Sequence, residues 1–342
     1  MRKTLKADGI SRRAFVWSAA AGAAVAGTAT PLRTVWAAPS KLRFVTFGVK
    51  NSIWAKPFFQ FQKDVNEVSN GELELTWAGG PEVIHPFQAG EAVGKGVFDI
   101  THSANSYFAA AVPEAIGLAS GTGSVDSVRQ SGAFGALDKI CRDKLNTSLI
   151  GTPLNGVGYV FILREKPTSL DFFKGKKIRS IPLYDPILKA LGAATVTTSP
   201  VEAYTALERG VVDGLGWSDL GVIDYNFHDH AKFLMLPTFY QLRSAHLINA
   251  DKLNKMGGEQ QKVLKEAALR TDKWATRWCQ DKRNSEHAAM KAKGLQEVWL
   301  PEVDGKRFVE LTERLLWEKI IKDSPANGPM LKKLFDKATA MG

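Results

Sequence analysis

The chain has few cysteines and none of the short motifs that mark common exported enzymes. Its 342 residues contain two cysteines, whose spacing fits no metal site. No Gly-x-Gly-x-x-Gly follows a strand pattern, and neither Cys-x-x-Cys nor Gly-x-Ser-x-Gly occurs. These absences disfavour nucleotide-dependent, thiol-redox and serine-hydrolase chemistry. The sequence therefore predicts a protein that is not an enzyme and that holds no cofactor.

The two cysteines, Cys141 and Cys279, leave two states open. Both lie in helical surroundings, and an oxidising compartment would permit a disulfide between them. Two buried free thiols are the simpler interpretation, because a buried unpaired cysteine behaves as a small apolar residue. We expect free thiols.

No apolar run is long enough to span a bilayer, but the N-terminus has the order of an export signal. Residues 11–16, Ser-Arg-Arg-Ala-Phe-Val, look like the twin-arginine signature, and an alanine-rich stretch over 18–28 and a cleavage site at 35–37 follow. We interpret residues 1–37 as a twin-arginine signal peptide, which would place the mature protein in the periplasm. The alternative, a disordered basic tail of a cytoplasmic protein, would not show this order of segments.

The net charge of +10 does not indicate nucleic-acid binding. Residues 1–37 hold six basic residues against Asp8, a net charge of +5, so the remaining chain carries the other +5 of the total of +10. In that remainder, Lys and Arg are interleaved with acids and form no basic stripe, and no aromatic RNA-recognition pattern occurs. We expect no nucleic-acid partner, although mild positive charge would help to attract anionic solutes.

The first half of the chain alternates strands with helices. Period-two apolar patterns predict strands over 41–46 and 72–77, and helical spacing of apolar residues predicts a helix over 54–68. A short helix over 86–93 and a strand over 97–101 complete a β-α-β-α-β unit with a parallel half-sheet. Because about three hundred residues after the signal exceed one compact core, a second domain is expected.

Strands of that second domain deliver two side chains to one sheet edge. The β-branched and aromatic run 159–163 predicts the entering strand, 177–179 is a short strand ending in an arginine, and 211–213 starts another strand. Arg179 and Trp217 therefore emerge from the ends of neighbouring strands. Open α/β sheets bind ligands at that edge.

The segment between these strands carries helix-end signals. Ser199 is an N-cap, Glu202 closes a capping box, and Gly210 suits a left-handed helix stop. Residues 91–99 and 202–213 share one order: helix, glycine stop, two apolar residues and aspartate. This short repeat indicates two domains of similar construction that face one another.

The segment 258–293 is predicted to form one long helix, because it has no proline or internal glycine and is followed by Gly294. At 1.5 Å per residue, such a helix approaches about 50 Å. A coiled-coil arm is disfavoured because the apolar stripe of the helix fades after Trp278. Helical patterns over 308–319 and 330–338 predict two closing helices.

The arrangement over 174–217 resembles the solute-binding proteins of tripartite ATP-independent periplasmic (TRAP) transporters, of the dicarboxylate-receptor-like family. This resemblance extends over 42–334. It implies an α/β, two-domain periplasmic binding protein-like fold in which the long helix spans both domains. The implied division of the chain is a signal peptide over 1–37, domain I over 38–157 with about 246–285, and domain II over 158–245 with about 286–342.

The resemblance implies that Arg179 binds a substrate carboxylate and that Trp217 faces the ligand. A guanidinium can form two parallel charge-assisted hydrogen bonds to a carboxylate, and indole offers a flat wall with one donor. Alternatively, Arg179 is a surface residue paired with Asp185 and Trp217 is a core residue. Some keto-acid-binding relatives hold a metal with a glutamate just before this tryptophan; here Gly216 stands there, so we expect no metal.

Further ligand contacts are expected from both domains, each with core packing as the alternative. The candidates are Tyr159 and Tyr184 from domain II, and Trp54, Phe87, Asn105 and Tyr107 from loops after the domain I strands. Arg164 is expected in a structural or rim position. His85 and His102 have no partner at metal-ligand spacing and are expected in core or hydrogen-bonding roles.

The resemblance implies a periplasmic receptor that captures a small organic carboxylate by domain closure and delivers it to the small and large membrane subunits of a transporter. The aromatic residues near the strand ends, with no obvious second cation, favour a monocarboxylate with an apolar or aromatic part. A 2-oxo or 2-hydroxy acid is the second choice. Two other functions stay open: an exported cofactor-dependent enzyme, and a receptor that presents its ligand to a sensor kinase.

Overall fold

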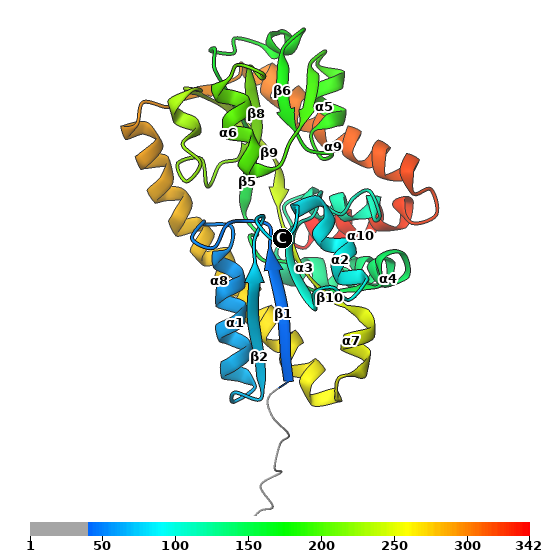
Figure 1. Ribbon diagram of the computed structural model, residues 1–342. Coiled ribbons are helices and arrows are strands. Elements are labelled where there is room, and N and C mark those ends of the chain that lie inside the picture. Colours follow the sequence, from blue (N-terminus) through cyan, green and yellow to red (C-terminus); the bar gives the residue numbers. More distant parts are fainter. Residues whose placement is uncertain (1–39) are drawn as a thin grey trace, which may run out of the picture. The chain divides into compact units, whose positions relative to one another are not determined.

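The computed structural model describes residues 40–342, and the predicted signal peptide lies outside them. The described chain is built around two β-sheets flanked by helices (Figure 1). The first sheet has the strand order β2 (Leu73–Gly79), β1 (Ser40–Thr46), β3 (Ile100–Ala104), β10 (Ser244–Asn249) and β4 (Thr147–Gly151). β1 is parallel to both β2 and β3, which confirms the predicted parallel half-sheet.

The second sheet contains the later strands. Its order is β11 (Gln296–Trp299), β9 (Phe233–Leu242), β5 (Val157–Leu163), β8 (Gly214–Ser218), β6 (Lys177–Ser180) and β7 (Ala194–Thr197). The chain passes from the first sheet to the second between β4 and β5, and it returns between β9 and β10. β6 runs parallel to both β7 and β8, so the ends of β6 and β8 lie at one edge.

Short helices connect these strands. They are α1 (Lys56–Val68), α2 (Ala89–Gly94), α3 (Val125–Gln130), α4 (Ala133–Leu145), α5 (Asp185–Ala190), α6 (Pro200–Glu208) and α7 (Ala250–Lys255), with 3-10 turns at η1 (Pro86–Gln88), η2 (Pro113–Ala119), η3 (Leu170–Phe173) and η4 (Phe227–Asp229). The α6 N-terminus confirms the predicted capping, because the Glu202 carboxylate accepts the Ser199 backbone N–H at 2.8 Å. Gly210 adopts the predicted left-handed backbone, with φ of +68°.

The long helix α8 (Gly258–Ala292) contacts α1 and β4 beside the first sheet and β5 of the second (Figure 1). This confirms the predicted helix that spans both domains. The closing helices α9 (Glu302–Asp323) and α10 (Gly328–Ala340) are longer than predicted. α9 packs on β9 of the second sheet, and α10 packs on α3, α4 and α9. The predicted domain boundaries stay predictions.

Two strands begin later than their apolar patterns indicated. β3 begins at Ile100 instead of residue 97, and β8 begins at Gly214 instead of residue 211. In both places the apolar pair after the glycine includes an exposed valine, Val97 at 54% and Val211 at 48% exposure. These residues belong to the turn that follows the preceding helix, so the buried strand starts three residues further on.

Both cysteines are buried free thiols, as expected. Burial raises the pKa of the Cys279 thiol to about 12 and the pKa of the Cys141 thiol above its ordinary range. In residues 40–342, no helix combines the length and apolar character needed to cross a membrane.

The core of the first sheet contains a pair of histidines. His102 and His246 lie directly opposite each other on β3 and β10, with ring centroids 4.9 Å apart, and both are fully buried. Burial lowers the pKa of His102 to about 3 and the pKa of His246 well below its ordinary value. The folded protein therefore keeps both imidazoles neutral.

We expect these histidines to destabilise the protein in acid. Below about pH 6.5 each imidazole is protonated in the unfolded chain but not in the folded protein. The unfolded state therefore binds more protons, and the free energy of unfolding decreases as the pH is lowered. Each group contributes up to about 1.4 kcal/mol per pH unit. Replacing His246 by phenylalanine should therefore flatten the pH dependence of urea unfolding between about pH 6.5 and 5.

The comparison with wild type isolates the imidazole. Asp272, whose pKa burial raises to about 6, titrates in this range with the opposite sign, but it is common to both proteins. His85→Phe, which replaces an exposed imidazole, supplies the control for the substitution itself. An unaltered slope in His246→Phe would contradict the prediction.

Candidate functional site

A cavity lies where the strand ends of the two sheets meet. Its volume is about 40 Å³. The lining residues come from both sheets: Phe47, Trp54, Ala104 and Tyr107 from the first, and Tyr159, Arg179, Ile181, Tyr184, Pro200, Trp217, Ser218 and Leu242 from the second and its connections. Arg179 is the one lining residue with a formal charge, and the others are mostly aromatic or aliphatic.

Arg179 extends from the end of β6 and is 1% exposed. Its guanidinium donates to neutral oxygens: Nη1 to the Gly216 carbonyl at 3.1 Å, Nη2 to the Thr198 carbonyl at 2.7 Å, and Nε to the Thr198 hydroxyl at 3.3 Å. A guanidinium has five N–H donors. These three bonds therefore orient the group and leave two donors for other partners.

No carboxylate forms an ion pair with Arg179 among residues 40–342. Asp185, the acid considered as its partner, accepts a hydrogen bond from the Ser180 hydroxyl at 2.7 Å instead. By contrast, Arg164 donates to the carbonyls of Leu207 and Val212, which is the structural role expected for it. A buried arginine bonded only to neutral groups keeps its positive charge uncompensated.

The cavity walls are aromatic. Trp54 and Trp217 approach each other edge to face at 6.1 Å between centroids, one from each sheet's side. The guanidinium carbon of Arg179 lies 5.1 Å from the Trp217 ring centroid, within cation–π range. The Tyr159 and Tyr184 rings pack edge to face at 5.3 Å.

The cavity offers hydrogen-bond donors. The indole nitrogens of Trp54 and Trp217 are buried without a partner in the described part of the chain, and an indole nitrogen can only donate. Burial raises the pKa values of Tyr107, Tyr159 and Tyr184, against an opposing effect of Arg179. The phenols therefore stay protonated and can donate. Such a donor set suits an acceptor-rich, anionic molecule.

Six of the eight candidate residues named from the sequence line this cavity: Trp54, Tyr107, Tyr159, Arg179, Tyr184 and Trp217. Phe87 and Asn105 do not. Phe87 packs edge to face behind Tyr107 at 4.6 Å, and Asn105 is fully buried with neither amide atom bonded within residues 40–342.

Sequence reasoning missed the other six lining residues, which are Phe47, Ala104, Ile181, Pro200, Ser218 and Leu242. Three of them have a local signal that could have identified them. Phe47 directly follows β1, Pro200 opens the helix α6, and Ser218 ends β8 next to Trp217. All three therefore stand at the ligand-binding edge of an open sheet.

Gly216 has a steric reason to be glycine. A Cβ built there would lie 2.5 Å from the Tyr184 ring, closer than real Cβ contacts. The glutamate that some relatives carry would thus have to displace Tyr184. Within residues 40–342, no group of three or more His, Cys, Asp or Glu side chains is placed to hold a metal ion.

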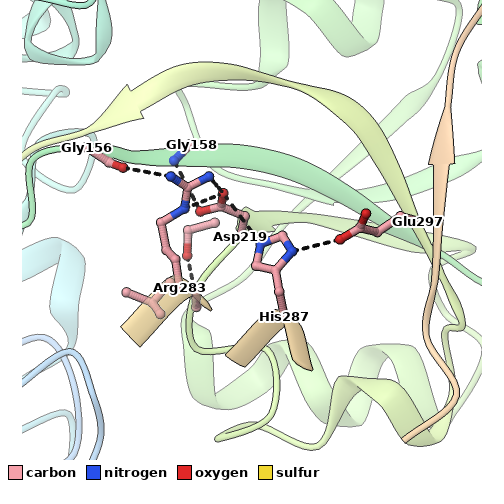
Figure 2. A network of polar contacts seen from close by, with 8 residues as sticks. Gly156, Gly158, Asp219, Arg283, His287 and Glu297 are labelled. Carbon is pink, nitrogen blue, oxygen red and sulfur yellow. Dashed lines mark hydrogen bonds and ion pairs between the residues drawn. The ribbon is translucent and has the colours of Figure 1, made fainter. Parts of the chain in front are cut away.

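A buried ionic network supports the cavity from the side of α8 (Figure 2). Asp219, directly after Ser218, is fully buried and accepts from Arg283 of α8, with Nε at 2.8 Å, and from the Gly158 backbone N–H at 3.2 Å. His287, one helical turn on, places Nε2 3.9 Å from Asp219 and bonds Glu297 through Nδ1 at 2.8 Å. The contact with Asp219 raises the His287 pKa.

The network joins α8 to the two strands that carry Tyr159 and Trp217. Arg283 also donates to the Gly156 carbonyl at 3.3 Å, next to β5. The long helix therefore fixes the positions of two cavity walls without lining the cavity itself.

Comparison with known proteins supports this description. The model of bacterial extracellular solute-binding protein, family 7, matches residues 44–323. A monocarboxylate 2-oxoacid-binding periplasmic protein of Nostoc sp. is 24% identical over 218 residues, which are 60% of this chain and 59% of that relative. The aligned part of the chain thus spans less than two thirds of that relative's length.

Solved structures share the fold. A TRAP periplasmic solute-binding protein from Desulfovibrio salexigens, with bound orotic acid, superposes with a TM-score of 0.79 at 20% identity, covering 88% of this chain and 99% of that one. An extracytoplasmic solute receptor of Bordetella pertussis that binds pyroglutamic acid gives 0.76 at 16% identity, covering 87% and 99%. Both are two-domain binding-protein folds, as predicted here. With the family match over 44–323, the chain belongs to bacterial extracellular solute-binding protein family 7, the group of TRAP solute-binding proteins that it resembled in sequence.

Proposed function

We propose that this protein is the periplasmic receptor of a TRAP transporter and captures a small organic acid through Arg179. Ligand binding would shift an open–closed equilibrium, because the acid contacts both domains only in the closed form. The closed receptor would then deliver the acid to the small and large membrane subunits. The named relatives are binding proteins, which supports a receptor without enzymatic activity or resident cofactor.

The observation that carries the proposal is the state of Arg179. It is buried at a cavity wall, is held by three neutral acceptors, and has no ion pair within the described residues. A buried charge without a counter-charge is costly, and a ligand carboxylate would remove that cost. The two remaining N–H groups match the two oxygens of a carboxylate.

The cavity favours one carboxylate over two. Arg179 is the one arginine or lysine among its lining residues, and the other walls are largely aromatic. We therefore propose a monocarboxylate with an apolar or aromatic part, with a 2-oxo or 2-hydroxy acid as the second choice. Two observations support an additional acceptor on the ligand: the unpartnered Trp54 and Trp217 N–H groups, and the 2-oxoacid named for the Nostoc relative.

A panel of acids tests the proposal by thermal unfolding. A monocarboxylate at one hundred times its Kd stabilises the folded state by about 2.7 kcal/mol, which corresponds to about 5 °C in Tm for a chain of this size. The methyl ester of the same acid lacks the charge and should give no shift. If only dicarboxylates or sugars stabilise the protein, the proposed ligand class is wrong. Mass spectrometry of molecules released from the undenatured protein would identify the natural acid.

A further inference from the structure

Two loops from opposite sides of the cavity meet directly. The 51–55 loop follows β1 of the first sheet, and the 219–224 loop follows β8 of the second. The Ile53 backbone N–H donates to the Asp224 carboxylate at 2.9 Å. Trp54, the next residue, lays its indole on Gly221, where a built Cβ would lie 2.5 Å from the ring. We call these two interactions the closure contact.

The 219–224 loop is held by α8 from behind. Arg283 binds Asp219 at the start of the loop (Figure 2). The buried Glu286, 9% exposed, accepts the Ile223 backbone N–H at 3.1 Å. These two contacts hold the 219–224 loop in a fixed position relative to α8. The 51–55 loop then packs against this loop.

The closure contact also completes the cavity. Trp54 is a wall residue, and its ring lies against Trp217 at the place where the two loops meet. Gly221 adopts φ of +81° and has no side chain, so the indole can lie on its backbone. Any side chain at 221 would occupy the space of the Trp54 ring.

We propose that Asp224 and Gly221 are positioning residues that set the open–closed equilibrium of the receptor. They touch no ligand in this proposal; they stabilise the closed form by holding the 51–55 loop. Domain opening that separates the two sheets would break the hydrogen bond and unstack the indole. Binding and closure are thereby coupled through Trp54. The inference rests on the proposed receptor function.

The first test measures binding of 4-methyl-2-oxopentanoate, a small apolar 2-oxo acid. Asp224→Ala removes the acceptor and should raise Kd about 2- to 10-fold, mainly through faster dissociation. Asp224→Asn keeps an acceptor oxygen and should stay near wild type. Gly221→Ala should raise Kd at least about 10-fold, because its methyl group collides with Trp54 only in the closed form.

Matched controls separate closure from other effects. Gly210 is also left-handed, with φ of +68°, but a built Cβ there meets nothing within 4 Å, so Gly210→Ala reproduces the backbone strain alone. Asp281, exposed on α8, supplies the same change of charge in Asp281→Ala. Wild-type Kd values and dissociation rates in both Asp224→Ala and Gly221→Ala would overturn the proposal.

A second test needs no ligand. In the double variant Ile53→Cys/Asp224→Cys, a short thiol cross-linker should join the loops, whereas the single variant Ile53→Cys should form no such cross-link. Cys141 and Cys279 are buried and should not compete. Absence of the cross-link in the double variant would overturn the closure contact itself. Efficient cross-linking together with no binding of 4-methyl-2-oxopentanoate would exclude this acid as a ligand and leave the contact standing; the panel of acids then tests the ligand class.

Discussion

Replacing Arg179 by methionine is expected to abolish the binding of small carboxylates, raising Kd at least about 100-fold. The proposed site uses two charge-assisted hydrogen bonds from this guanidinium, each of which contributes about 1.5–3 kcal/mol net, and tenfold in Kd corresponds to about 1.4 kcal/mol. Methionine keeps an unbranched apolar side chain but supplies no charge and no donor. Isothermal titration with 4-methyl-2-oxopentanoate measures the change.

Two further variants make this result interpretable. Arg179→Lys keeps the charge but loses the planar fork, so its affinity should fall between those of wild type and methionine. Arg277→Met removes an exposed arginine of α8 and should bind like wild type. Because Arg179 also bonds Thr198 and Gly216, circular dichroism must show that the methionine variant is folded. Undiminished binding by a folded Arg179→Met protein would refute the proposed site.

The second large effect is expected on stability. Replacing Arg283 by methionine should lower the free energy of unfolding by about 3 kcal/mol, because it leaves the carboxylate of Asp219 buried without its main cation. Asp219 has no exposed surface, whereas about a third of the Arg283 side chain (33%) is exposed, so the lower end of the range for buried pairs applies. Urea unfolding at about pH 8 measures the loss.

The pH dependence of this loss gives a second readout. His287 lies 3.9 Å from Asp219, and its pKa is raised by that contact. At about pH 6 more of the imidazole is protonated, so it should partly replace the lost arginine and make the loss smaller than at about pH 8. A methionine at the exposed Arg277 should change stability little. A loss below about 1 kcal/mol at both pH values would show that the ion pair contributes little, as surface pairs do.

Adding Asp219→Asn to Arg283→Met tests the cause of that loss. The neutral amide can still accept the Gly158 N–H, and it carries no charge that needs a partner. The double variant should therefore be more stable than Arg283→Met alone. If instead the stability losses of Arg283→Met and Asp219→Asn add in the double variant, the loss in Arg283→Met comes from packing by the arginine stem and not from charge.

The fold could be predicted well where the signal is local. The helix at 258–292, the α6 cap at Ser199 and the left-handed Gly210 depend on residues within one or two turns, and all are confirmed. The predicted strand starts were less accurate, since β3 and β8 each begin three residues after the predicted position. Val97 and Val211 are apolar yet exposed, and the pattern of apolar residues does not show burial directly.

Part of the site could also be predicted, because local sequence patterns show where strands end. Arg179 and Trp217 stand at ends of neighbouring strands, a position that topology makes a ligand edge. Phe87 shows the limit: it also follows a strand, but in the folded chain it lies behind Tyr107 and not at the cavity. Whether an aromatic side chain faces a cavity or packs behind another depends on its rotamer and on neighbours distant in the sequence.

The α/β order, the long helix and the arginine at the end of a strand could be predicted from local patterns, because strand period, helix period and capping are set by nearby residues. Three features could not: that Trp54 and Trp217 share one cavity, that Arg179 has no acidic partner within residues 40–342, and that Asp219 is paired with α8. These are distances between segments more than sixty residues apart. Chain folding, and not local preference, sets such distances and the burial that gives the charges their effect.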